Sequence, residues 1–190
     1  MQNKLSIPGI GLRNIKTALA VFLCLISYAF AGFVTEKASA AGLTVPGFIE
    51  TLISRETAIY ACLAAVVVMG SSVSKSFRSG ISRIIGTVIG GLLGSAYLHI
   101  GGYLNFDKAA FILIPLGLIA LIYFLTLIKE KDAVVIAAAT YLIIVITLDT
   151  GAPLLYAFNR VLSTSYGVII SLCVNNFIGR PKNEEKIKNE

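Results

Sequence analysis

Two arginines in a strongly apolar sequence are the first candidates for chemistry. Arg83 and Arg160 each open the pattern R-x-x-small-T-x-x-G, so Thr87 and Thr164 follow one helical turn later. A guanidinium group stays charged and can hold a carboxylate through two parallel hydrogen bonds. Two such groups facing one cleft, each with a threonine hydroxyl nearby, would suit a small organic anion. We therefore predict that these four residues bind a substrate.

The same four residues also have structural interpretations. Arg83 could be an ordinary basic residue at the cytoplasmic end of a helix. Arg160 could extend toward the membrane interface or pair with Asp149. Thr87 and Thr164 could each donate a hydrogen bond to the backbone of their own helix.

Glu56 and Asp149 are the carboxylates that we expect at the outer ends of their helices. Ionisable residues inside a membrane are unfavourable and often functional. Each carboxylate could pair with an arginine, Arg55 or Arg160, or could carry a coupling proton if burial raised its pKa. We predict Glu56 and Asp149 as candidates for proton coupling.

Motifs for catalysis or metal binding are absent from the sequence. It holds no G-x-x-x-x-G-K-[ST] loop, no HExxH and no G-x-S-x-G pattern. The three cysteines have no C-x-x-C spacing, so we expect them to pack inside helices. The one histidine, His99, cannot build a metal site alone. We expect no enzyme activity, no cofactor and no metal.

The elements that must position these residues are membrane-spanning helices. Apolar residues make up 56% of the 190 residues, charged residues only 14%, and the mean hydropathy is +0.84. A helix needs about 20 mostly apolar residues to cross a bilayer, and every backbone amide must be paired there. The long windows without charge predict an all-α polytopic membrane protein with six transmembrane helices in domain 15–179, at about 15–35, 56–73, 82–104, 109–128, 132–148 and 154–178.

The distribution of lysine and arginine predicts the orientation. With the N-terminus in the cytoplasm, the cytoplasmic segments hold 12 of the 16 basic residues and the outer segments hold 4. We therefore predict that segment 1–14 and the charged tail 180–190 are both cytoplasmic. The basic residues flank the helices instead of forming one patch, so we expect the lipid bilayer and no nucleic acid as a partner.

The segment around 38–49 allows two further interpretations. Its Gly and Pro residues favour an outer loop or a shallow interfacial segment. Alternatively, Ala38-Ser39-Ala40 resembles the cleavage site of a signal peptide, although the preceding apolar stretch is longer than the usual 7–15 or so residues.

The arginine pattern predicts an internal repeat. Arg83–Gly90 and Arg160–Gly167 lie 77 residues apart, and the same offset maps 56–70 onto 133–147. An odd number of helices per copy reverses the orientation of the second copy, so we predict an inverted repeat of two three-helix units, as is common in secondary transporters.

Small residues recur every fourth position in both copies of the repeat. Such rows let helix backbones approach closely in lipid. We predict a helix-packing role, within or between protomers, for Gly86, Gly90, Gly94, Ser163, Gly167 and Ser171.

Five stretches together are typical of one family: Gly11–Ala18, Val66–Ser72, Arg83–Gly90, Arg160–Gly167 and Val174–Pro181. With them, the sequence resembles the fusaric acid resistance and aromatic acid exporter group of membrane proteins. The resemblance covers roughly residues 11–181. Arg83, Gly86, Thr87 and Gly90 correspond to characteristic positions of the family.

The resemblance implies a six-helix unit of the bacterial inner membrane that exports aromatic carboxylates with the proton gradient and forms homo-oligomers. Family members often add a cytoplasmic domain after the sixth helix, and this sequence ends 9 residues after Pro181. Our leading hypothesis is thus a secondary transporter for small aromatic or other organic carboxylates. The alternative is a non-transporting membrane subunit or anchor that assembles with another protein.

Overall fold

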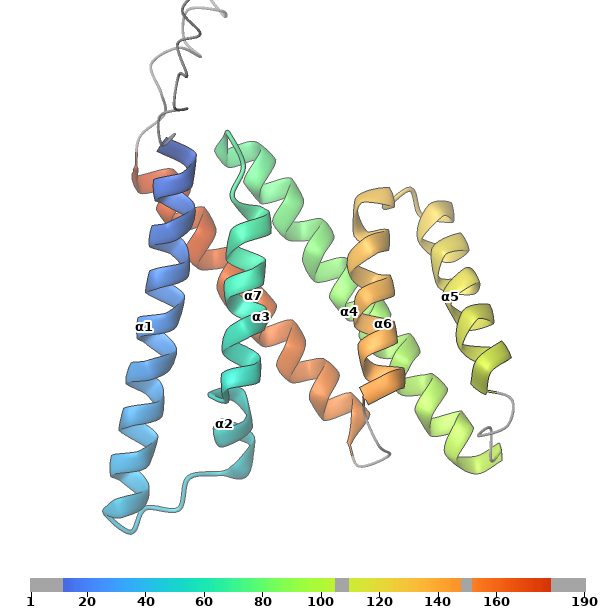
Figure 1. The fold of residues 1–190 in the computed structure, drawn as a ribbon, viewed down its shortest axis with the longest axis horizontal. Helices are drawn as coiled ribbons and strands as arrows, with labels where there is room; N and C mark the ends of the chain where they lie inside the picture. The colour runs from blue at the N-terminus through green and yellow to red at the C-terminus, as the bar shows by residue number, and fades with distance from the viewer. Residues whose placement is uncertain (1–11, 105–109, 148–151, 179–190) are drawn as a thin grey trace, which may run out of the picture.

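The structure is a computed structural model that describes residues 12–104, 110–147 and 152–178. The described residues are helical or lie in turns, which confirms the all-α prediction (Figure 1). The elements are α1 (Leu12–Ala40), α2 (Gly47–Leu52), α3 (Arg55–Val68), α4 (Val73–Leu104), α5 (Ala110–Leu127), the short 3-10 helix η2 (Lys131–Ala133), α6 (Val134–Thr147) and α7 (Pro153–Phe177).

Local sequence explains where two of these helices begin. Ser54 caps α3, because its hydroxyl accepts a hydrogen bond from the backbone N–H of Thr57. Pro153 opens α7 at a position where a missing N–H and a fixed φ are tolerated.

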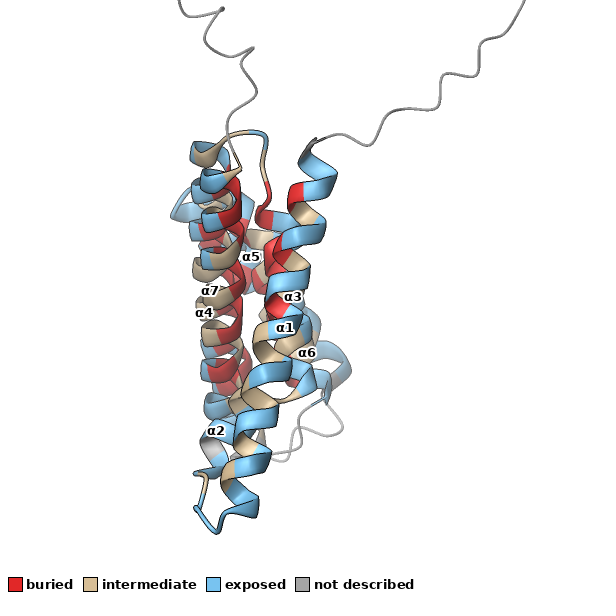
Figure 2. Ribbon diagram, turned by 90° about the vertical axis from the view of Figure 1, so that its left-hand side faces the viewer, coloured by how far each residue is buried: buried red, intermediate tan, exposed pale blue. Residues whose placement is uncertain are grey.

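The helices form two layers. The long helices α4 and α7 make one layer. The helices α1, α3 and α6 lie together on one side of this layer (Figure 2). The most extensive packing joins α4 to α6, α3 to α7, and α4 to α7. On the two flanks, α1 packs on α3 and α7, and α5 packs on α6 and α4. The helices α1, α3 and α4 form the first half of the chain, and α5, α6 and α7 form the second. The middle helix of each half, α3 or α6, therefore packs on the long helix of the other half, α7 or α4.

The α4–α7 interface is antiparallel and tightly packed. A Cβ atom at Gly80 would lie 2.6 Å from Cγ1 of Val168, and one at Gly91 would lie 3.0 Å from Cβ of Ala157. Because the residue numbers rise on α4 while they fall on α7, these two contacts define the register. Midway between them, the residues near 85–86 of α4 lie opposite those near 162–163 of α7.

Two helix boundaries differ from the prediction. Helix α4 begins at Val73, well before residue 82, because Lys75 and Arg78 lie exposed on its first turns and do not interrupt it. Segment 38–49 is not wholly a loop, since α1 continues to Ala40 and Gly47 begins α2. Charge-free windows locate apolar helices, but they cannot show a helix that continues through exposed charges.

Helix length decides how many elements can cross a bilayer by themselves. Three helices are long and apolar enough among the described residues: 13–40, 73–101 and 153–177. Helix α5 is apolar but shorter, and α3 and α6 have 14 residues each. Fourteen residues span about 21 Å, less than the roughly 30 Å of a hydrocarbon core. The prediction of six complete transmembrane helices and of their inverted repeat therefore stays a prediction.

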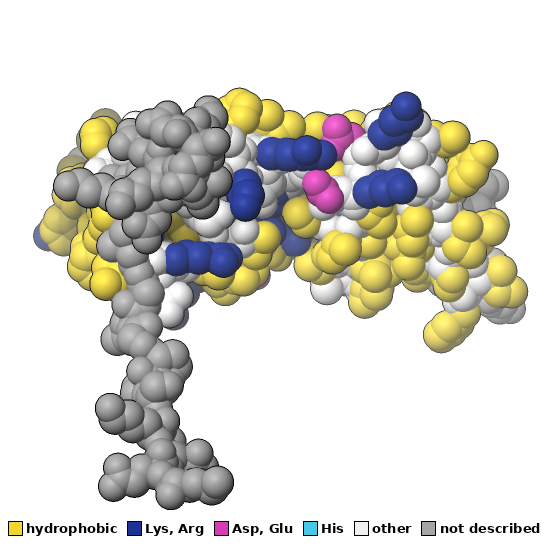
Figure 3. Space-filling view, turned by 90° about the horizontal axis from the view of Figure 1, so that it is seen from above, with side chains coloured by type: hydrophobic (Ala, Val, Ile, Leu, Met, Phe, Trp, Pro, Cys, Tyr) yellow, Lys and Arg dark blue, Asp and Glu magenta, His cyan; other side chains and the backbone are white. Residues whose placement is uncertain are grey.

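The surface of the fold is largely apolar. Phe111 and Ile112 of α5 are 90% and 74% exposed, and large aliphatic and aromatic side chains are exposed along α1 as well. Figure 3 shows lysine and arginine side chains gathered on the face at the top of Figure 1, with hydrophobic side chains around its rim. Continuous apolar surface is unfavourable in water, whereas lipid can cover it.

Candidate functional site

The two predicted arginines lie close together at the centre of the fold. Arg83 of α4 and Arg160 of α7 each lie between two and three residues before the midpoint of the antiparallel interface. At 1.5 Å per residue, this places their positions about 7–8 Å apart along the helix axes. Both side chains are half-buried, and their positive charges act on each other. The structure thus brings together two residues that are 77 positions apart in the sequence.

Helix α3 holds the guanidinium of Arg160 by aromatic contacts. The Cζ atom of Arg160 lies 3.9 Å from the centroid of the Tyr60 ring, which is a cation–π contact. The hydroxyls of Tyr60 and Tyr156 are 2.6 Å apart and hydrogen bonded. Nη1 of Arg160 is buried and finds no hydrogen-bond partner among the described residues. The arginine is therefore held in place while one of its donors is left for another acceptor.

Arg83 has a different environment from its counterpart in the repeat. Its Nε is also buried without a hydrogen-bond partner among the described residues. However, the 77-residue offset places Ala137 and Ser79 where Arg160 has Tyr60 and Tyr156. The two arginines therefore occupy equivalent positions in the repeat, but the tyrosines beside Arg160 have no counterparts beside Arg83.

The predicted threonines are both buried, and one of them makes a backbone contact. Thr87 Oγ1 donates a hydrogen bond to the carbonyl oxygen of Arg83 at 2.8 Å. This is the local contact that the structural interpretation expects. While it is made, the hydroxyl of Thr87 cannot donate to a carboxylate, although its oxygen can still accept. Thr164 lies at the corresponding position on α7 and is buried.

Of the two predicted carboxylates the structure describes Glu56 alone, and Glu56 forms no ion pair with either arginine. Glu56 lies in the first turn of α3 with an exposed side chain, where the helix dipole favours a negative charge. Asp149 lies outside the described residues. The burial that proton coupling needs is thus not found at Glu56.

The row of small residues on α4 contacts α6. A Cβ atom at Gly86 would lie 2.7 Å from the carbonyl oxygen of Ala133, and one at Gly90 would overlap the backbone of Ala137. Gly94 continues the row toward the end of α6. Larger side chains at these positions would therefore push the two helices apart.

The matching row on α7 contacts α3. A Cβ atom at Gly167 would overlap the carbonyl oxygen of Ala61. Ser163 and Ser171, one turn to either side, are both buried. The structure thus places both rows at contacts within the chain.

A buried polar network joins three helices. Lys16 of α1 donates to Oδ1 of Asn175 at 3.2 Å, and Nδ2 of Asn175 donates to Ser76 Oγ at 2.9 Å. The backbone N–H of Gly70 also donates to Ser76 Oγ, at 2.8 Å. A lysine inside the first predicted span was the available signal for this network. It ties α1, α4, α7 and the turn before α4 together at one end of the fold.

No group of three or more His, Cys, Asp or Glu residues that could hold a metal ion occurs in the described parts of the chain.

Long apolar helices and an apolar surface define an all-helical integral membrane protein. Residues 43–174, more than half of the chain, match the fusaric acid resistance protein-like family, and the protein belongs to that family. This confirms the resemblance found in the sequence. Proteins of the family serve membrane transport in general and are not typically enzymes.

The matched range includes Arg83 and Arg160, while α1 lies outside it. No curated protein and no solved structure matches the chain.

Proposed function

We propose that this protein is a secondary transporter that carries small aromatic or other organic carboxylates out of a bacterial cell, driven by protons. The observation that carries the proposal is the central arginine pair. Arg83 and Arg160 come from different halves of the chain and lie near the midpoint of the α4–α7 interface, and each has a buried donor with no hydrogen-bond partner in the described part of the chain. Buried donors and positive charge suit a carboxylate, which can accept hydrogen bonds from both guanidinium groups.

The packing of the helices supports the inverted repeat. The α3–α7 contact mirrors the α6–α4 contact, and the contacts of α1 mirror those of α5. We infer six membrane crossings, in which α2 extends α3 and η2 extends α6. Broken helices of this kind are common near the substrate sites of secondary transporters.

The proposed mechanism uses the repulsion between the two arginines. Two like charges in a half-buried site disfavour each other, and an anion bound between them removes this unfavourable interaction. Rocking of one three-helix unit against the other would then carry the anion across. We propose that Asp149, the other carboxylate that the sequence predicted for this role, carries the coupling proton on the outer side.

Orientation and assembly complete the proposal. The 12-to-4 split of basic residues supports cytoplasmic termini in the inner membrane, and the lysine- and arginine-rich face in Figure 3 would then face the cytoplasm. The exposed apolar flanks of α1 and α5 leave room for a homo-oligomer within the bilayer.

The test is uptake of labelled 4-hydroxybenzoate into proteoliposomes that contain only this protein, with and without a pH gradient. We expect gradient-dependent flux that Arg83→Gln and Arg160→Gln abolish. Arg78→Gln is the matched control, since Arg78 lies exposed on the same helix as Arg83. If both central variants retained normal flux, the site assignment would be wrong. Absence of any flux from folded protein, with a stoichiometric partner copurifying, would favour the non-transporting membrane subunit.

A further inference from the structure

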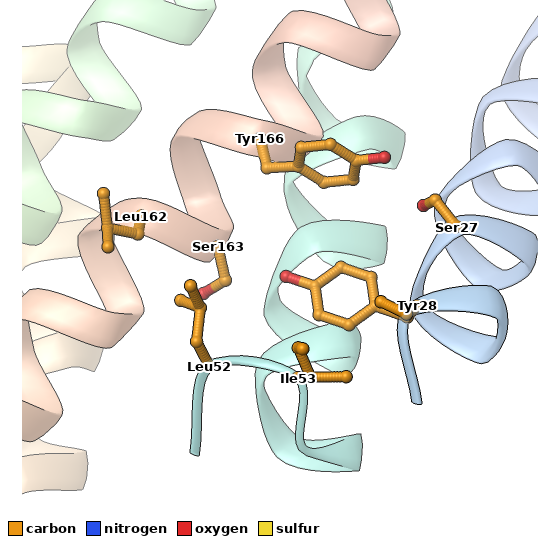
Figure 4. A pocket seen from close by; sticks show the side chains of 8 residues that line it. Ser27, Tyr28, Leu52, Ile53, Leu162, Ser163 and Tyr166 are labelled. Carbon is orange, nitrogen blue, oxygen red and sulfur yellow. The ribbon is translucent and has the colours of Figure 1, made fainter. Parts of the chain in front are cut away.

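A cavity of about 340 Å³ lies between α1, the end of α2 and α7, and neither central arginine lines it (Figure 4). Tyr28 and Tyr166 form two of its walls, and their rings meet edge to face with centroids 5.8 Å apart. Leu52, Ile53 and Leu162 supply aliphatic surface. The cavity is therefore an aromatic and aliphatic site, separate from the charged centre.

The two serine hydroxyls of the cavity have already donated their protons, whereas the hydroxyls of Tyr28 and Tyr166 can still donate to a ligand. Ser27 Oγ already donates to the carbonyl oxygen of Cys24 at 2.8 Å, and Ser163 Oγ donates to that of Asn159 at 2.9 Å. Each serine oxygen keeps lone pairs that can accept. Ser163 is 1% exposed, and Figure 4 shows the Tyr28 hydroxyl pointing toward it. A ligand that brings one donor would fit this arrangement.

Charge excludes the proposed transport substrate from this cavity. None of the described side chains that line it is charged. A carboxylate would lose its hydration and find no cation among the described lining residues in return. A neutral molecule avoids this cost.

Size and shape favour a single ring. Cavities that hold small molecules begin at about 300 Å³, so this one is at the small end of the range. Tyrosine rings that meet edge to face provide the geometry in which another aromatic ring packs well. A lipid acyl chain would fill the space but would leave the serine acceptors unused.

We propose that this cavity binds a neutral, single-ring phenol that enters from the bilayer, with its hydroxyl donating to Oγ of the half-buried Ser27. This is a second binding site, of a different ligand class from the carboxylate site, and it does not rest on the transport proposal.

The test uses ¹⁹F NMR of 4-fluorophenol with the full chain in lipid nanodiscs, and empty nanodiscs measure partition into lipid. We expect saturable binding that falls at least tenfold in Ala31→Phe, because Ala31 lines the cavity and the new ring would fill it. Ala29→Phe is the matched control, since Ala29 lies exposed on the same helix. Equal binding to both variants would overturn the proposal.

A second variant and two further ligands test the chemistry if Ala31→Phe does not fold. Ser27→Ala should weaken 4-fluorophenol binding several-fold and leave the weaker binding of 4-fluoroanisole, which has no donor, unchanged. The charged 4-fluorobenzoate should not compete with the phenol. Competition by the benzoate, or a phospholipid that copurifies with the wild type and is lost from Ala31→Phe, would show a different occupant and refute the proposal.

Discussion

The contact between Tyr60 and Arg160 gives a sharp prediction about the carboxylate site. Tyr60→Leu removes the aromatic ring from beneath the guanidinium, whereas Tyr60→Phe keeps the ring and removes only the hydroxyl that bonds to Tyr156. If the ring positions Arg160 for substrate, the leucine variant should lose affinity and the phenylalanine variant should largely keep it. The two variants therefore separate the cation–π contact from the hydroxyl pair.

The size of the effect follows from the geometry. Cation–π contacts contribute about 0.5–1 kcal/mol at exposed sites and about 2 kcal/mol when desolvated. Both side chains are half-buried and the separation is 3.9 Å, so the upper part of this range, about 1–2 kcal/mol, applies. Since about 1.4 kcal/mol is tenfold in affinity, Tyr60→Leu should raise the half-saturating substrate concentration by roughly 5–30-fold. Tyr60→Phe should raise it by no more than about twofold.

The assay is the concentration dependence of 4-hydroxybenzoate flux in proteoliposomes, with protein insertion measured for each variant. Tyr123→Leu serves as the control, because Tyr123 is 65% exposed on α5, and α5 packs mainly on α6 and α4. A role in folding alone would lower the maximum flux through loss of inserted protein and leave half-saturation unchanged. An unchanged half-saturating concentration in Tyr60→Leu would refute the positioning role of Tyr60.

Three further predictions concern the scaffold. Gly90→Ala should lower stability by about 1–3 kcal/mol in thermal unfolding, because its Cβ meets the α6 backbone. Gly32→Ala, where the nearest atom is 4.0 Å away, should be neutral or slightly stabilising, and equal effects would contradict the packing argument. Asn175→Leu should cost about 1–3 kcal/mol by leaving buried partners unpaired, while Asn176→Leu, at an exposed position, should cost little. Lys129→Cys in a chain without its native cysteines should react with an impermeant reagent from the cytoplasmic side only; labelling from outside would reverse the proposed orientation.

The sequence predicted the class of the fold because its signal is local. A run of residues without charge indicates a helix in lipid wherever it occurs, and five of the six predicted spans agree with helices to within about five residues at each end. The exception is α4, which begins at Val73 and not near residue 82. Lys75 and Arg78 lie exposed on its first turns, so the helix continues through them. The fourfold spacing of glycine and serine was equally local, and it indicated which faces allow close approach.

Only part of the candidate site could be predicted from local sequence patterns. The repeat pattern singled out Arg83 and Arg160, but nothing in their spacing required them to share an interface. The ring of Tyr60 lies 100 residues before Arg160 in the chain and carries no motif, so its role could not be predicted. Glu56 was selected by charge alone, and its exposure depends on how α3 packs.

By itself, the sequence determined an all-helical membrane protein, its family and the small-residue faces of its helices, because hydropathy and periodicity are properties of neighbouring residues. Tertiary structure alone decided that the two arginines lie on either side of the midpoint of the α4–α7 interface, that a tyrosine of α3 contacts Arg160, and that Lys16 lies buried against Asn175. These outcomes depend on the antiparallel register of two long helices. That register is set by side-chain packing across the interface, and contacts between distant residues are not encoded in any local pattern.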